Sequence, residues 1–132
     1  MRILLDTNVI IAALIARGVC HELLEHCARR HKLVTSDFIL DEVRDKLIQK
    51  FKYTSEVADE AVRLLRSRME VVTPASLDAQ VCRDPDDDSI LATATAGNCK
   101  FIITGDKDLL VLQTFGEVKI VGPGDFQRLE SN

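Results

Sequence analysis

The side chains of this sequence that could do chemistry are carboxylates, and they are densest in RDPDDDSILATATAG, residues 83–97. Four aspartates fall within five positions of this segment: Asp84, Asp86, Asp87 and Asp88. A helix that begins here uses one carboxylate as its cap and gains from another near its positive end, which accounts for only part of the cluster. Crowded carboxylates suppress one another's ionisation unless a cation neutralises them. The excess of negative charge therefore indicates a metal site.

Two further acids stand where strands are predicted to end. Asp6 directly follows the predicted strand 2–5, and Asp106 follows the predicted strand 101–104 after Gly105. Binding sites in open parallel α/β sheets form outside the carboxyl ends of the strands, so both acids are expected at the same rim. Each is also an ordinary helix cap or first-turn residue, so neither indicates a site by itself.

Glu42 lies within the apolar face of a helix that is predicted to begin at Ser36 and to continue to about Phe51. At about 100° per residue, this face collects Phe38, Ile39, Val43, Leu47 and Phe51. An acid at such a position is unfavourable unless it has a partner. Two partners stay open: Lys46, one turn later on the same helix, or a cation that is shared with other acids.

Asp88 is predicted to be the inward-facing aspartate of the cluster, because it shares a helix face with Leu91, Ala92 and Thr95. The other aspartates are expected to face solvent or to cap the helix. The predicted site then consists of acids from four segments: Asp6, Glu42, Asp88 and Asp106. An all-oxygen ligand set of this kind selects Mg²⁺ or Mn²⁺ rather than zinc, and it suits phosphate chemistry.

Cysteines and histidines show no spacing typical of a zinc site. The cysteines form no CxxC pair, and the histidines are five residues apart, which scatters them round a helix: Cys20, Cys27, Cys82, Cys99, His21, His26 and His31. We therefore expect free thiols in a reducing compartment and a cytoplasmic protein. Residues 1–20 resemble a signal peptide only in part, because Asp6, Thr7 and Asn8 interrupt the apolar run.

The elements that must position the acids alternate between strand and helix. Strands are predicted at 2–5, 32–35, 70–73, 101–104 and 118–121. Helices are predicted at 8–16, 20–30, from Ser36 to about Phe51, from Thr54 or Ser55 to about Met69, in the run that ends at Gly97, and briefly in GDKDLLVL. This alternation predicts one three-layer α/β/α domain over residues 1–132, with a central parallel sheet that is covered on both faces and no membrane-spanning segment.

The overall charge gives no attraction to nucleic acid. The 132 residues carry a formal net charge of −4, so any nucleic-acid binding would rest on local basic stretches. Residues 28–32 and Arg63, Arg66 and Arg68 are the candidates. Solvated helix faces are the favoured interpretation of both groups.

Four stretches, in chain order, resemble the acidic motifs of PIN domains: ILLDTNVIIAAL, DFILDEV with Glu42, RDPDDDSILATATAG and FIITGDKDLL. They resemble most closely the toxin components of bacterial and archaeal toxin–antitoxin systems, over nearly the whole chain. The resemblance implies a Rossmann-like α/β/α fold and a Mg²⁺- or Mn²⁺-dependent ribonuclease. It also implies an RNA substrate, a homodimer, and an antitoxin partner that blocks the site.

The resemblance also implies roles for individual residues. By position, Asp6, Glu42 and Asp88 are the core metal ligands, and Asp106 is the fourth acid. Asn8 and Thr104 are supporting hydrogen-bonding residues, and Asp108 and Asp84 are weaker candidates. A cation would lower the pKa of a bound water so that hydroxide attacks phosphorus in line.

Two other classes of protein compete with this interpretation. A receiver-like signalling domain needs an adjacent acidic pair after the first strand and a lone aspartate after the third. In this chain the first predicted strand is followed by Asp6 alone, and the strand near Val72 leads into Thr73-Pro74 without an aspartate. That class is disfavoured. A PIN-like module that keeps its acids but only binds RNA or protein stays open.

Overall fold

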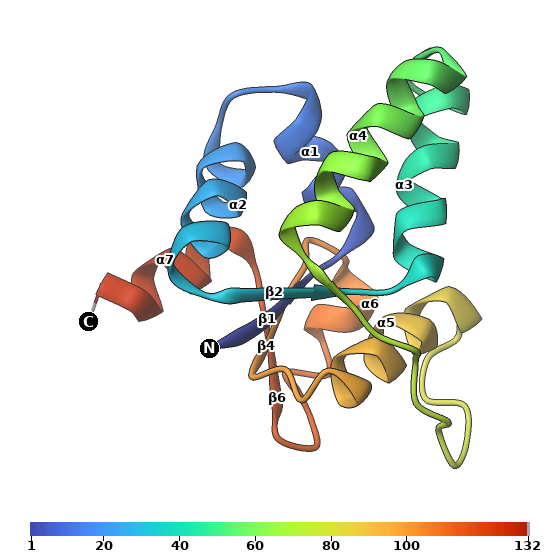
Figure 1. Cartoon of the computed structure of the whole chain (residues 1–132). Coiled ribbons are helices and arrows are strands. Elements are labelled where there is room, and N and C mark those ends of the chain that lie inside the picture. Colours follow the sequence, from blue (N-terminus) through green and yellow to red (C-terminus); the bar gives the residue numbers. More distant parts are fainter. Residues whose placement is uncertain (132) are drawn as a thin grey trace.

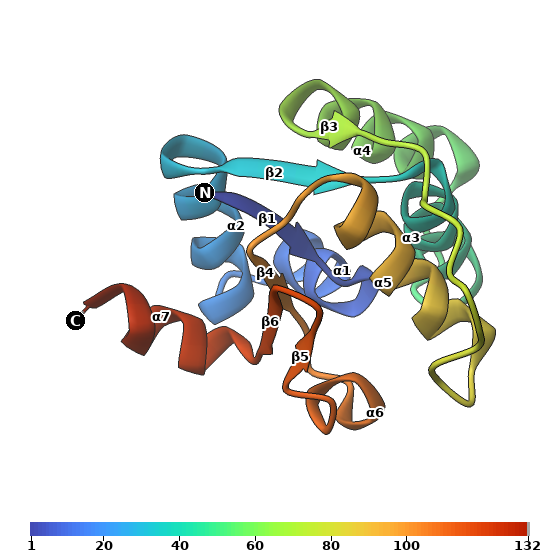
Figure 2. The same cartoon turned by 90° about the horizontal axis from the view of Figure 1, so that it is seen from below.

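The computed structural model describes residues 1–131 as one sheet with helices on both of its faces (Figures 1 and 2). Its strands are β1 (Arg2–Leu5), β2 (Lys32–Thr35), β3 (Glu70–Val71), β4 (Phe101–Ile103), β5 (Thr114–Phe115) and β6 (Val118–Val121). Its helices are α1 (Thr7–Ile15), α2 (Val19–Arg30), α3 (Asp37–Gln49), α4 (Ser55–Arg68), α5 (Pro85–Ala96), α6 (Lys107–Leu110) and α7 (Pro123–Ser131). Helices α1 to α4 lie on one side of the sheet and α5 lies on the other.

The sheet has the order β3-β2-β1-β4-β6-β5 and is mostly parallel. Only β5 runs antiparallel, pairing with β6 so that Thr114 lies opposite Lys119. The predicted α/β class with a central parallel sheet is thus confirmed. Strand β5 and helix α7 were not predicted from the sequence. A two-residue strand is too short to show the alternating pattern by which strands are predicted.

The strand order places β1 in the middle of the sheet, with β2 and β3 on one side and β4 and β6 on the other. Ligands of such sheets bind where the order reverses, outside the carboxyl ends of the two adjacent strands. Here these strands are β1 and β4, and Asp6 N donates to Ile103 O at 3.0 Å across them. The segments after Leu5 and after Ile103 therefore begin side by side.

The central strands are apolar because both of their faces are covered. Ile3, Leu4 and Leu5 of β1 are at most 1% exposed, as are Ile102 and Ile103 of β4. Because helices cover both faces of the sheet, polar side chains of a site are expected on the loops at the strand ends.

The predicted helix starts are confirmed where a side chain caps them. Ser36 Oγ accepts from Ile39 N at the start of α3, and Thr54 Oγ1 accepts from Val57 N at the start of α4. Gly97 follows α5 as predicted, but its φ is −85°, and the left-handed residue is Asn98. Gly97 is needed for space, because a Cβ there would lie 2.5 Å from Val34 Cγ1 of β2.

Within residues 1–131, no single helix is long and apolar enough to cross a membrane. The helix pair α1 and α2 meets the length and composition criteria only together, and the two are bent by 106° from one another.

Candidate active site

Asp6 stands at the end of β1 and is held from both sides. Its Oδ1 accepts from Thr7 N at 2.7 Å, which caps α1, and its Oδ2 accepts from the Thr104 hydroxyl at 2.7 Å. The residue is only 7% exposed, and this burial raises the pKa of its carboxyl group although both hydrogen bonds oppose the shift. Asp6 is therefore both a helix cap and an ordered, buried acid.

Thr104 connects Asp6 to the segment that follows β4. It is fully buried, and while it donates to Asp6 its Oγ1 accepts from Asp106 N at 3.0 Å. Asp106 then caps α6, because its Oδ1 accepts from Asp108 N at 2.8 Å. One hydroxyl thus fixes the relative position of two acids that are 100 residues apart in the chain.

Glu42 reaches the same place from α3. The Thr7 hydroxyl donates to Glu42 Oε1 at 2.7 Å, so Thr7 ties the first turn of α1 to α3. Burial raises the pKa of Glu42, and the charges of Asp86 and Asp6 add to the rise. The charge of Lys46 lowers the pKa of Glu42. The hydrogen bond of the Lys46 ammonium group, however, goes to Asn8 Oδ1 at 3.2 Å.

The aspartates at the start of α5 divide between two sides of the helix. Asp84 caps α5 by accepting from Asp86 N at 2.9 Å, and Pro85 occupies the first turn. Asp87 is 8% exposed, and burial raises its pKa to about 6, with further contributions from Asp106, Asp84 and Asp6. Burial and the neighbouring carboxylates act in the same direction on this pKa, so Asp87 lies where an uncompensated negative charge is unfavourable.

The expectation that Asp88 turns inward is wrong. Its carboxylate accepts from Val81 N at 3.0 Å and from Cys82 N at 2.7 Å, and so anchors the loop before α5. Both candidate faces of α5 carry buried residues, so apolar neighbours did not discriminate between Asp87 and Asp88. The sequence did carry one difference: the Asp88 face includes the polar Thr95, whereas the Asp87 face continues with Ile90, Leu91 and Ala94. In the structure Thr95 is exposed.

The acids converge on one cavity of about 170 Å³, outside the carboxyl ends of β1 and β4. Its lining consists of Asp6, Thr7, Asn8, Glu42, Lys46, Asp84, Asp86, Asp87, Ile90 and Asp106. We call this the acidic cavity. Of the residues singled out from the sequence, Asp6, Asn8, Glu42, Asp84 and Asp106 line it, whereas Asp88 does not. Sequence reasoning missed Thr7, Asp86 and Asp87 as parts of the site.

Thr104 and Asp108 lie next to the acidic cavity. Thr104 does not line the cavity but holds Asp6 and Asp106 in place through its hydroxyl group. Carboxylate oxygens of Asp87, Asp106 and Asp108 lie within 4.8 Å of one another, and Asp108 also accepts from the Arg83 guanidinium at 3.2 Å. The Arg83 side chain is 88% exposed, so its ion pair with Asp108 is open to solvent.

The acidic cavity fits a hard divalent cation. Its potential ligands are carboxylate, hydroxyl and amide oxygens, with no thiol or imidazole among the lining residues. The pKa values of Asp6, Glu42 and Asp87 are all raised by burial, and neighbouring carboxylates add to each rise. The positive charges of the chain therefore do not fully neutralise these acids. A cation would supply the missing positive charge, and Lys46 supplies one positive charge from the chain itself.

Fold and site together define a Rossmann-like α/β domain with an acidic cavity at the point where its strand order reverses. The chain belongs to the PIN domain family, whose sequence pattern matches residues 2–108. No curated protein sequence matches the chain.

Solved structures share the fold at low sequence identity. VapBC2 from Rickettsia felis, bound to a DNA fragment from its promoter, gives a TM-score of 0.67 at 15% identity over 92% of this chain and 98% of the other. VapBC-1 from nontypeable Haemophilus influenzae gives 0.66 at 19% identity over 94% and 99%. VapC20 from Mycobacterium tuberculosis, a sarcin–ricin loop cleaving toxin, gives 0.57 at 17% identity over 89% and 98%.

Proposed function

We propose that this protein is a ribonuclease that hydrolyses RNA phosphodiester bonds with Mg²⁺ or Mn²⁺, and that it is the toxin of a toxin–antitoxin pair. The observation that carries the proposal is the meeting of Asp6, Glu42, Asp87 and Asp106, from four separate segments, at one cavity. Membership of the PIN domain family supports a nuclease. The fold shared with VapC20, which is a cleaving toxin, supports the biological role.

We assign the metal ligands to Asp6, Glu42, Asp87 and Asp106, with Asp87 taking the place that the sequence suggested for Asp88. Asp86 and Asp84 line the same cavity and are available to waters of a bound cation. Asn8, Thr104 and Asp108 keep the supporting roles that the sequence suggested for them. The support for this assignment is burial and proximity, because the assigned acids are the ones that line the acidic cavity.

The chain's own residues prepare the site for phosphate chemistry. Thr104 and Thr7 N hold the two oxygens of Asp6, and the Thr7 hydroxyl orients Glu42. Lys46 is positioned to offset the charge of an RNA phosphate at the rim. The chemistry that a bound divalent cation supplies is a hydroxide nucleophile at neutral pH and neutralisation of phosphate charge.

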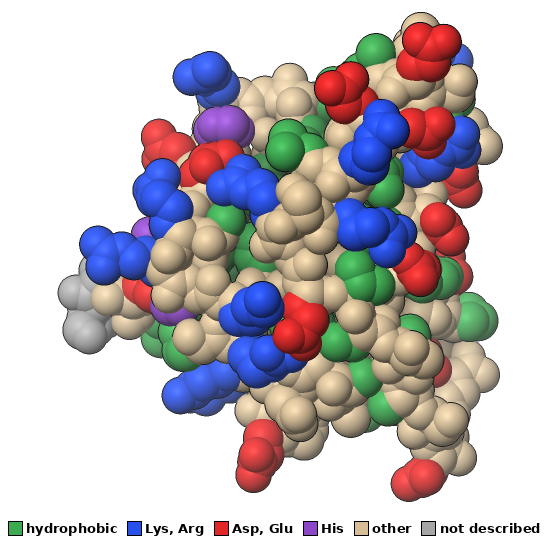
Figure 3. Space-filling model, in the orientation of Figure 1, with side chains coloured by type: hydrophobic (Ala, Val, Ile, Leu, Met, Phe, Trp, Pro, Cys, Tyr) green, Lys and Arg blue, Asp and Glu red, His purple; other side chains and the backbone are tan. Residues whose placement is uncertain are grey.

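Two of the three α4 arginines that the sequence offered as RNA contacts are engaged with acids. Arg66 donates to Asp37 at 2.8 Å, and Arg68 makes two hydrogen bonds to Glu25 at 3.1 Å. On the face shown in Figure 3, Lys and Arg side chains are interspersed with Asp and Glu. These contacts support the view that α4 is a solvated helix face. We propose that RNA phosphates are bound near the cavity by Lys46 and by Arg83, whose ion pair with Asp108 is open to solvent and can exchange for a phosphate.

We further propose a cytoplasmic homodimer that binds an antitoxin protein. VapBC2 and VapBC-1, whose fold the chain shares, support such a partner. Large apolar side chains are 40–58% exposed on α1, α2 and α4, which lie on the same side of the sheet: Ile15, Val19, Val57 and Leu64. The four cysteines are free, which is consistent with a reducing compartment.

The decisive experiment incubates chelator-treated protein with structured and unstructured RNA and with added Mn²⁺ or Mg²⁺. We expect cleavage that requires the added ion and is lost in Asp6→Asn, because Asn caps α1 equally well but removes a buried charge. RNA binding without cleavage, unchanged by chelator and by Asp6→Asn, would support the non-catalytic module instead. A small reading frame next to the gene, whose product copurifies and inhibits cleavage, is the expected sign of an antitoxin.

A further inference from the structure

A second group of ligating side chains lies where β2 begins and α2 meets α7, at the opposite end of the sheet from the acidic cavity. His26 belongs to α2, His31 caps its end, and Glu130 belongs to α7. Glu130 Oε1 lies 2.7 Å from His26 Nε2, and Oε2 lies 2.8 Å from His31 Nε2. One ligand atom from each residue lies within 4.8 Å of the other two. We call these residues the histidine triad.

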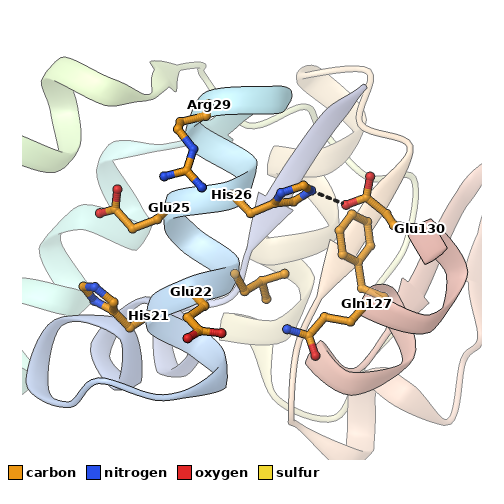
Figure 4. Close-up of a pocket in the computed structure, with 9 residues that line it drawn as sticks. His21, Glu22, Glu25, His26, Arg29, Gln127 and Glu130 are labelled. Atoms are coloured by element: carbon orange, nitrogen blue, oxygen red, sulfur yellow. Dashed lines mark hydrogen bonds and ion pairs between the residues drawn. The ribbon is translucent and has the colours of Figure 1, made fainter.

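Two members of the histidine triad, His26 and Glu130, line a cavity of about 850 Å³ between α2 and α7, and His31 lies behind them. Figure 4 shows His26 of α2 and Glu130 of α7 facing one another at its edge, with Glu22 of α2 and Gln127 of α7 further along the two helices. The His26 side chain is 42% exposed and that of Glu130 is 25% exposed. An ion in solvent therefore reaches the ligand atoms of His26 and Glu130 directly, and it meets His31 Nε2 through the Glu130 carboxylate that both histidines contact.

Packing orients the most buried member of the triad. The His31 side chain is 10% exposed, and its ring lies edge-on to the Phe126 ring at 6.2 Å and to the His26 ring at 5.7 Å. Phe126 is fully buried against Phe101 of β4, so His31 leans on the core. Its other ring nitrogen, Nδ1, lies 3.2 Å from the Met1 amino nitrogen. These contacts hold the His31 side chain in place before any ligand binds, so binding costs little side-chain entropy.

The carboxylate of Glu130 is held in its charged form. Burial acts to raise its pKa, but hydrogen bonds from His31 and His26 outweigh burial, and the pKa lies below the usual value. Two imidazoles and one ionised carboxylate make a ligand set that zinc accepts in proteins. This set differs in kind from the all-oxygen lining of the acidic cavity.

We propose that His26, His31 and Glu130 bind a divalent transition-metal ion of the Zn²⁺ class, which ties α7 to α2. The ligands are the two Nε2 atoms and a Glu130 oxygen, with a fourth position left for water. Tetrahedral ligands about 2.0–2.1 Å from zinc lie roughly 3.3 Å apart, so the N···O separations must open by about half an ångström. The exposed side chains of His26 and Glu130 allow this by small rotations.

The test uses the full chain without an affinity tag, because tag histidines bind the same ions. Asp6→Asn and Asp106→Asn are introduced together to weaken the acidic cavity, and both retain good helix caps. The chelator-stripped protein is titrated with Zn²⁺ by calorimetry at pH 8, because protons compete with the metal for its ligands. We expect one equivalent to bind, and binding to weaken by about 100-fold or more in His31→Gln and in Glu130→Gln.

His21→Gln is the matched control, because His21 lies on α2 beside the same cavity but contacts Ala13 O instead of Glu130. Its Zn²⁺ affinity should equal that of the parent. Equal affinity in His31→Gln and Glu130→Gln, with folding confirmed by circular dichroism, would overturn the proposal, as would the absence of a bound equivalent. Co²⁺ gives a second readout: a visible spectrum without a thiolate band supports the triad, and a thiolate band overturns it.

Hydrogen exchange tests the structural consequence. Zn²⁺ should slow exchange of the α7 amides in the parent protein and leave them unchanged in Glu130→Gln. Exchange in α7 that does not respond to Zn²⁺ in the parent would refute the link between α7 and α2.

Discussion

Asp87 and Asp88 are adjacent on α5, yet their carboxylates serve different parts of the molecule. Asp87 is 8% exposed and lines the acidic cavity, whereas Asp88 accepts the backbone N–H groups of Val81 and Cys82. Successive residues of a helix are about 100° apart, so one position separates an acid of the cavity from an acid that holds a loop.

This division predicts opposite phenotypes for two conservative substitutions. Asp87→Asn should lower the rate of RNA cleavage on the order of 100-fold, because it removes a proposed metal ligand. Asp88→Asn should keep the rate within about threefold and lower the free energy of unfolding by about 1 kcal/mol, because two N–H donors lose a charged acceptor. Single-turnover cleavage and urea unfolding measure the two effects. The assignment of Asp87 fails if Asp88→Asn is the variant that loses cleavage.

Thr104 is predicted to support both stability and metal binding. Thr104→Val leaves Asp6 Oδ2 and Asp106 N without their shared partner, so we expect a loss of about 2 kcal/mol in unfolding free energy and weaker Mn²⁺ binding. Thr104→Ser keeps the hydroxyl and should lose only about 1 kcal/mol, for one buried methyl group. Urea unfolding and Mn²⁺ titration compare them. Equal Mn²⁺ affinity in Val and Ser variants would argue against this role.

The metal-free protein should become more stable as the pH falls from 7 to 5. The pKa of Asp87 is raised to about 6 in the folded state, so its stabilising contribution is fully present below the unfolded pKa near 3.8 and is lost as pH rises through 6. Asp6 and Glu42 shift in the same direction. For Asp87 alone, the difference between pH 5 and 7 is on the order of 1 kcal/mol.

Chemical unfolding at the two pH values, in chelator, measures this dependence. The comparison with Asp87→Asn isolates the contribution of Asp87, because all other titrating groups are common to both proteins. A pH response that is identical in the wild type and in Asp87→Asn would show that Asp87 does not titrate in this range. Saturating Mn²⁺ should flatten the wild-type response, because the ion binds the ionised form.

Lys46 is predicted to compete with the metal and to assist RNA. Its charge lowers the pKa values of Asp6 and Glu42, so it partly neutralises the same carboxylates that a cation would bind. Lys46→Gln should therefore tighten Mn²⁺ binding by about threefold and raise the KM for RNA by a similar factor. The salt dependence of RNA binding should also become less steep, by about one phosphate contact. Lys50→Gln, on an exposed residue just beyond α3, is the matched control.

The sequence by itself determined most of the elements and three of the four acids that we propose as metal ligands. Runs of apolar residues marked β1, β2, β4 and β6 because a sheet covered on both faces excludes polar side chains. Glu42 was identified because an acid within an apolar helix face requires a partner. Asp6 and Asp106 followed from their places after two strands, because parallel strands end at a common edge.

Only the tertiary structure decided which neighbours of each acid matter. Periodicity gave Asp87 and Asp88 similar apolar neighbours, and the choice between them depended on where the loop before α5 packs. The spacing of His26 and His31 argued against a shared ligand, but α7 brings Glu130 against both. Local patterns report burial along one element, whereas a site is made by side chains from several elements, and their meeting depends on packing between elements.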